Sequence, residues 1–146
     1  MRLQKNTLLA IHSVLEFAAQ PARQLSVAEI AARLKASPHH LAKVLRALGR
    51  AGLVESMRGA RGGYRFAGNA KRVTLMDVIG LFEDIGADAP RARRARRPAE
   101  RALEQVLAEI DQTARATFGS VTLDTLLKLT ARHERKLAAV RGVTTL

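Results

Sequence analysis

Residues 37–66 constrain the fold of this chain more than any other stretch. Their sequence is SPHHLAKVLRALGRAGLVESMRGARGGYRF. Ser37 is a natural helix N-cap, and Pro38 falls at the first helical position, where its missing N–H costs nothing. Apolar side chains then recur at helical spacing as far as Arg50, and Gly52 ends the pattern. The stretch predicts a helix over 38–50 that ends before Gly52, so the residues after it are not helical.

That following structure reads as a short β-hairpin. Two runs bounded by glycine, Leu53–Met57 and Tyr64–Ala67, have the length and composition of strands. The segment between them carries three glycines that can supply positive φ, and it also carries two arginines. A helix with a basic outer face beside a hairpin with a basic tip is the arrangement with which a winged helix-turn-helix grips DNA.

The rest of the chain predicts further helices. One spans about 5–19, and a capping box of Ser26 and Glu29 opens a second, short helix. Thr74 and Asp77 resemble another N-cap pair. A long helix is expected over 99–118, and Ser120 and Thr122 precede a last, short helix. The expected fold is mainly α, with a winged domain over 1–85, an Arg-rich connector over 86–98, a dimerisation helix and final short helix over 99–131, and a charged tail over 132–146 that frays.

The charge of the chain favours a polyanionic partner. There are 25 Lys and Arg residues against 13 Asp and Glu residues, giving a formal charge of +12 at pH 7. Nucleic acid and an anionic membrane surface both fit such an excess. No apolar run is long enough to span a bilayer, and the N-terminus lacks a signal-peptide core, so a cytoplasmic location without membrane association is expected.

The absence of cysteine removes several classes of chemistry. Disulfides, thiol catalysis and thiolate metal sites are excluded. The four histidines (His12, His39, His40 and His133) are too scattered for a metal motif, and His12 is expected on the first helix near the core. No catalytic motif or acid–base set is present. The sequence therefore predicts neither an enzyme nor a cofactor.

The candidate DNA-binding residues belong to the helix over 38–50 and to the hairpin. Arginine and lysine donors suit both guanine edges and phosphates, and arginines at a small hairpin tip suit a minor groove. The candidates are Ser37, His39, His40, Lys43, Arg46, Arg50, Arg58, Arg61, Gly62, Gly63 and Tyr64. Alternatives remain open for some of them, because the histidines can be a surface pair without a role and Tyr64 can pack under the hairpin.

Two other features have two interpretations each. Five arginines among residues 91–97 form either a second nucleic-acid patch or a solvated connector. The long helix has a continuous apolar stripe that packs on its own domain or pairs with a second copy, and we favour a homodimer. The stripe consists of Leu103, Val106, Leu107, Ile110, Ala114 and Phe118. The natural place for a ligand pocket is between this helix and the winged domain, where Phe82, Ile85 and Leu103 either line the pocket or belong to the core.

Several motifs together resemble the Rrf-two family of bacterial winged-helix regulators. They are the opening MRL, the RAGLVES strand entry, the RGxxGGY wing, TLxDVI at the start of the expected fourth helix, and SVTLDTLL. The resemblance covers residues 1 to about 130. That family includes the iron–sulfur cluster regulator, the nitric-oxide-sensitive repressor and the cysteine-metabolism repressor.

The resemblance implies a dimeric transcription factor, usually a repressor, on a pseudo-palindromic promoter site. By position, the recognition helix is Ser37–Arg50, the wing is Arg58–Tyr64, and the long helix is the dimerisation helix. Sensing members carry three cysteines between the fourth and long helices. Here that interval reads ADAPRARRARRPAE, so the chain resembles the cluster-free branch, which responds to another effector or a partner protein. The alternative function is a winged-helix module that binds protein or RNA without selecting promoters.

Overall fold

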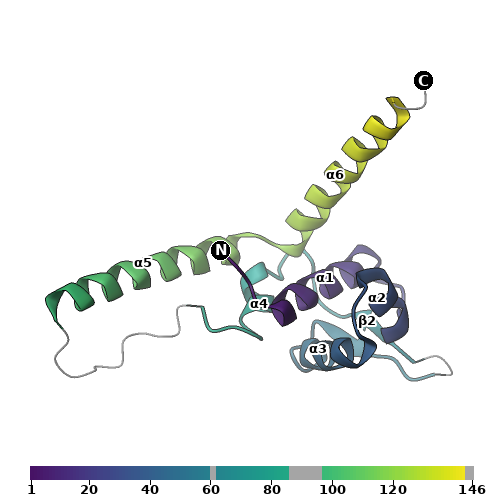
Figure 1. Cartoon of the computed structure of the whole chain (residues 1–146). Helices are drawn as coiled ribbons and strands as arrows, with labels where there is room; N and C mark the ends of the chain where they lie inside the picture. Colours follow the sequence, from purple (N-terminus) through teal and green to yellow (C-terminus); the bar gives the residue numbers. More distant parts are fainter. Residues whose placement is uncertain (60–61, 86–96, 144–146) are drawn as a thin grey trace.

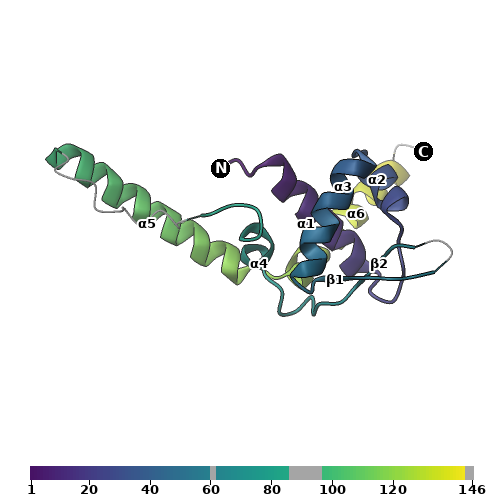
Figure 2. The same cartoon turned by 90° about the horizontal axis from the view of Figure 1, so that it is seen from below.

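The computed structural model describes residues 1–59, 62–85 and 97–143. Figure 1 shows a compact body, which contains the first helices and the hairpin, and two helices that project from it; Figure 2 shows the first of these two helices from below. In chain order the elements are α1 (Lys5–Ala19), α2 (Val27–Leu34), α3 (Pro38–Arg50), β1 (Val54–Ser56), β2 (Tyr64–Phe66), α4 (Leu75–Ile79), α5 (Pro98–Ser120) and α6 (Leu123–Val143). The structure has the expected mainly helical fold with a two-stranded wing.

The core of the body is built around α1. This helix contacts α2, α3, α4, α6 and β2, and its inward residues Ala10, Val14 and Phe17 are completely buried. Leu41, Leu45 and Leu48 of α3 are completely buried as well. Removing such side chains from water is the main stabilising contribution to a domain of this size. His12 is exposed rather than near the core, because it lies on the opposite side of the helix.

The start of each helix in the helix-turn-helix matches its sequence signal. Ser26 and Glu29 form the expected capping box, in which the Ser26 Oγ accepts from the Glu29 N–H and the Glu29 carboxylate accepts from the Ser26 N–H. Ser37 Oγ accepts from the His40 N–H at the start of α3. Lys35 joins the two helices in a left-handed conformation, with φ of 51°. These caps fix where α3 begins and therefore which of its side chains face outward.

The wing is a two-stranded antiparallel sheet, and Leu25 adds a single β-bridge at its edge. Val54 pairs with Phe66, and Ser56 pairs with Tyr64. Leu25, which precedes α2, exchanges two backbone hydrogen bonds of 2.9 Å with Tyr64. The wing is therefore attached to the start of the helix-turn-helix through β2 and not only through the end of α3.

A short seam of backbone hydrogen bonds joins the body to the projecting helices. Thr74 caps α4 and forms an antiparallel bridge with Thr122, which lies between α5 and α6. The Leu75 N–H donates to the Val121 carbonyl at 2.8 Å, and the Leu123 N–H donates to the Val73 carbonyl at 2.9 Å. Leu123 is completely buried. The junction between α5 and α6 is thus built into the core.

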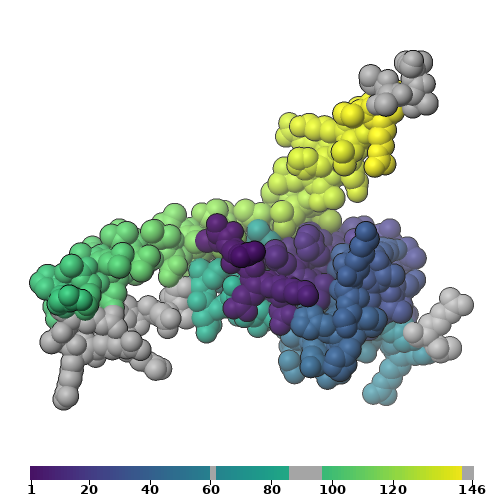
Figure 3. All heavy atoms as spheres, in the orientation of Figure 1, coloured from purple at the N-terminus to yellow at the C-terminus, as the bar shows by residue number. Residues whose placement is uncertain are grey.

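Beyond this junction, α5 and α6 project away from the body (Figure 3). No residue of α5 is buried, and α6 is exposed along most of its distal part. The expectation of a short final helix and a fraying tail after residue 131 is wrong for the described chain, since α6 continues to Val143. The tail was interpreted by its charge, but Arg, Lys, Glu, Leu and Ala all favour helix and no proline interrupts them. None of the described helices has the length and hydropathy needed to cross a membrane.

Candidate nucleic-acid interface

Helix α3 separates its apolar and basic residues onto opposite faces. Leu41, Val44, Leu45 and Leu48 are buried, while His39, Lys43, Arg46 and Arg50 are exposed. None of these four exposed side chains has an ion-pair or hydrogen-bond partner within the part of the chain that the structure describes. Their charged and polar groups are therefore hydrated and available to an anionic partner.

The two histidines at the start of α3 have different surroundings. His39 is exposed, whereas His40 is half-buried and its Nε2 forms a hydrogen bond with the Asn6 Oδ1 of α1. This bond ties the start of α3 to α1. His40 thus has a structural contact that the sequence did not indicate, because Asn6 is 34 positions away.

The wing places Arg58 on its exposed part, after β1. Arg61 lies outside the described residues, so its predicted groove contact stays a prediction. Gly62 and Gly63 have φ of 56° and 130°, and the Gly62 carbonyl accepts from the Gln24 Nε2 at 2.7 Å. Both glycines therefore serve the path of the hairpin, and Gln24 helps to hold the wing.

Tyr64 occupies a position that suits packing. It is half-buried against the core, and both its backbone N–H and its carbonyl are engaged by Leu25. A Cβ atom built on Gly49 would lie 3.9 Å from the Tyr64 Cε1, so the ring passes close to the backbone of α3. Of the two interpretations of Tyr64, the packing one agrees with this geometry.

The capping box of α2 carries an electrostatic signature. The pKa of Glu29 is lowered from its ordinary value of 4.5, mainly because its carboxylate accepts the Ser26 backbone N–H. Desolvation opposes this shift of the pKa, while the Ser26 hydroxyl and the charges of Arg23 and Arg33 reinforce it. A charged Glu29 at the N-terminus of α2 is favoured by the helix dipole.

The predicted dimerisation stripe is largely open on the long helix. Leu103, Val106, Leu107 and Ile110 are between 51% and 60% exposed. A shallow groove of about 460 Å³ runs over Val106, Ile110 and Ala114. Phe118, at the end of the stripe, packs instead against the core of its own chain. An exposed apolar strip of this length is unusual on a monomer and is typical of an interaction surface.

Of the arginine run, only Arg97 is described. Its guanidinium donates to the Glu100 Oε1 from Nε and Nη2, at 3.1 and 2.8 Å. This pair lies at the start of α5, so Arg97 stabilises the helix terminus. Residues 91–96 lie outside the described residues, and their predicted contact with nucleic acid stays a prediction.

Sequence reasoning missed the basic residues next to the helix-turn-helix. Lys5 of α1 and Lys35 of the turn between α2 and α3 are exposed and lie near the start of α3. Only the overall positive charge hinted at them. Lys35 is close to α3 in the sequence itself, whereas the proximity of Lys5 depends on how α1 packs on α3, which no local pattern encodes.

The comparisons with known proteins agree with this geometry. The model of the Rrf2 family, described as iron-dependent transcriptional regulators, matches residues 3–129. BadM of Rhodopseudomonas palustris, assigned as an HTH-type transcriptional regulator, is 53% identical over 136 residues, which cover 93% of this chain and 87% of that protein.

Two solved structures share the fold. CymR, the global cysteine regulator of B. subtilis, superposes with a TM-score of 0.73 at 26% identity, covering 88% of this chain and 98% of that one. IscR of T. potens has a TM-score of 0.72 at 21% identity, covering 89% of this chain and 88% of that one.

The iron in the description of the family does not fit the residues of this chain. An iron–sulfur cluster needs thiolate ligands, and the sequence has no cysteine. Residues 1–59, 62–85 and 97–143 also hold no group of three or more His, Asp or Glu side chains placed to bind a metal ion. The family match, the relative with near-complete coverage and the winged fold nevertheless agree: this chain belongs to the Rrf2 family, and it is a DNA-binding transcriptional regulator rather than an enzyme.

Proposed function

We propose that this regulator is a homodimeric repressor that binds a pseudo-palindromic promoter site without an iron–sulfur cluster. The observation that carries the proposal is the unpaired basic face of α3, with Lys43, Arg46 and Arg50 exposed beside the wing. A recognition helix of this kind enters the major groove, where guanidinium groups read guanine edges and phosphates. In this arrangement the wing contacts the adjacent minor groove.

The long helix supports the dimer in this proposal. The stripe from Leu103 to Ile110 is apolar and exposed, and the same stripe on a second copy would cover it. The resulting two-fold symmetry requires two half-sites whose centres are about 34–36 Å apart, or a multiple of that distance. In this proposal the dimer represses by occupying a site that overlaps the promoter and so excluding polymerase.

The test is selection of genomic DNA fragments by the purified protein at physiological salt, followed by sequencing. We expect enrichment of one inverted repeat. Arg46→Ala should relax the preference at particular bases by about 1–3 kcal/mol, since a bidentate guanine contact has that worth. Arg101→Ala is the matched control, because Arg101 is exposed on α5 away from α3. An unchanged motif with Arg46→Ala would remove Arg46 from base reading.

Two further outcomes would contradict the proposal as a whole. Recovery of fragments without any motif, together with preference for structured RNA, would favour the interaction module. Transcription in vitro from the selected promoter tests the sign of regulation, and an increase on adding the protein would contradict repression.

A further inference from the structure

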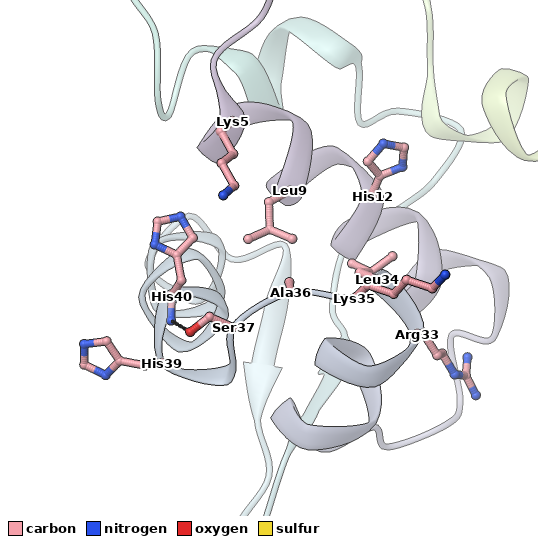
Figure 4. Close-up of a pocket in the computed structure, with 10 residues that line it drawn as sticks. All are labelled: Lys5, Leu9, His12, Arg33, Leu34, Lys35, Ala36, Ser37, His39 and His40. Atoms are coloured by element: carbon pink, nitrogen blue, oxygen red, sulfur yellow. Dashed lines mark hydrogen bonds between the residues drawn. The ribbon is translucent and has the colours of Figure 1, made fainter.

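A concave site lies beside the recognition helix, on the side formed by α1. This α1–α3 cavity has a volume of about 770 Å³ and is bounded by α1, the end of α2, the turn after it and the start of α3 (Figure 4). Small-molecule sites in proteins have volumes of about 300–1,000 Å³. This cavity is not the expected one between the long helix and the winged domain, because no residue of α5 lines it.

The floor of the cavity is apolar. Leu9 of α1 lies between the two walls, facing Leu34 and Ala36 (Figure 4). All three residues are half-buried. A phosphate group of DNA needs no such floor, because its two charged non-bridging oxygens are hydrated and bind to cations or N–H donors. An apolar ring or short hydrocarbon chain, by contrast, gains free energy by covering these side chains.

The rim of the cavity is cationic. Lys5 and Lys35 stand on opposite walls, and neither ammonium group has a partner within the described residues. Arg33 adds charge but is already paired with Glu16 at 2.9 Å. No carboxylate lines the cavity. An apolar floor beneath unpaired cations suits a ligand with an apolar body and one carboxylate.

We propose that the α1–α3 cavity binds a small amphipathic organic anion, such as an aromatic carboxylate, and that this anion is an effector of the regulator. The inference rests on the proposed function, because Ser37 and His39 line the cavity and also belong to the candidate DNA interface. A ligand that contacts them shifts the affinity for DNA, and DNA shifts the affinity for the ligand by the same factor.

The test uses 2-naphthoate as the anionic probe and 2-naphthamide as its uncharged counterpart. Isothermal titration of the full chain without DNA should show binding of 2-naphthoate, and binding of 2-naphthamide at least tenfold weaker. The double variant Lys5→Gln/Lys35→Gln should lose at least tenfold in affinity for 2-naphthoate. The matched control is Lys71→Gln/Arg72→Gln, which removes the same charge from an exposed loop outside the cavity and should bind as the parent does.

Methyl resonances locate the bound probe. Shifts at Leu9 and Leu34 support the α1–α3 cavity, whereas shifts confined to Val106 and Ile110 place the probe on the long helix and overturn the proposal. Equal affinity for the two naphthalene probes also overturns it. This comparison uses the parent protein and holds even if the double variant fails to fold.

The effect on DNA is measured separately. Saturating 2-naphthoate should change the operator affinity of the parent at least threefold and leave that of Lys5→Gln/Lys35→Gln unchanged. If the double variant binds DNA more weakly but 2-naphthoate as before, the lysines contact phosphate and the effector proposal is wrong. If the protein binds 2-naphthoate in the cavity but selects no DNA motif, the proposed function fails while the ligand site stands.

Discussion

Gly63 lies where the wing approaches the chain before α2 most closely. A Cβ atom there would be 2.6 Å from the Leu25 carbonyl oxygen, and the φ of 130° is outside the range that L residues adopt readily. Gly62 also has positive φ, at 56°, but open space surrounds its would-be Cβ atom. The two neighbouring glycines therefore differ in what a methyl group would meet.

Gly63→Ala should destabilise the protein by about 3 kcal/mol, because backbone strain and a steric clash combine. Gly62→Ala is the matched substitution and should cost only about 1 kcal/mol, since the left-handed region is strained but allowed. Urea unfolding measures both changes in the free energy of unfolding. Hydrogen exchange at the Tyr64 amide shows whether the wing detaches from Leu25. Equal effects of the two variants would mean that the close approach to Leu25 does not constrain the wing.

At the residue level, local signals were predictable and distant partners were not. The capping residues Ser26, Ser37 and Thr74 all accept the backbone hydrogen bonds that their positions predict. These bonds join residues three positions apart, so the sequence shows both partners together. The pairs of Asn6 with His40 and of Gln24 with Gly62 join residues 34 and 38 positions apart. No period or motif relates such residues before the chain is folded.

Among the elements, α5 is a long helix that has no buried residue within its own chain. Its exposed stripe is apolar, and the opposite face carries charged and polar groups such as Gln112. In the proposed dimer this stripe is the interface. Its stability then depends on the concentration of the second copy as well as on the contacts within one chain.

Ile110→Glu should convert the dimer to a monomer, because it places a charge in the middle of the stripe. Gln112→Glu is the control: it introduces the same side chain on the far face of α5 and should leave the dimer intact. Sedimentation velocity over a range of protein concentrations distinguishes the two species. If Ile110→Glu sediments as the parent does, the dimer interface lies elsewhere.

The boundaries of α1 and α3 followed from the sequence, whereas the end of α6 did not. Helix α1 begins and ends where its apolar spacing predicts, at Lys5 and Ala19, and α3 spans 38–50 as expected. The length of α6 was missed because a high charge density was equated with fraying. Of the candidate DNA interface, the outward face of α3 was predictable from helical periodicity. The contribution of α1 to the α1–α3 cavity was not, since it depends on how the helices cross.

For the whole molecule, a net charge of +12 makes binding to DNA depend on salt. Each phosphate contact adds about one unit to the slope of log affinity against log salt. Lys43→Gln should lower this slope by about one, because Lys43 belongs to the exposed face of α3. Lys136→Gln removes the same charge from the exposed distal part of α6 and should leave the slope unchanged. Filter binding at about 50–300 mM salt measures both slopes. Equal slopes for all three proteins would show that Lys43 contacts no phosphate.

The seam between residues 73–75 and 121–123 determines the angle between the winged body and α5. Its two backbone hydrogen bonds, with Leu123 locked in the core, fix the direction in which α5 leaves the winged body. In a dimer joined along α5, that direction determines the distance between the two copies of α3. A rotation of a few degrees at the seam displaces the far end of α5 more than its near end, because α5 is a helix of 23 residues. In the proposed dimer, the distance between the two half-sites is therefore determined at residues 73–75 and 121–123, which belong to neither α3 nor the wing.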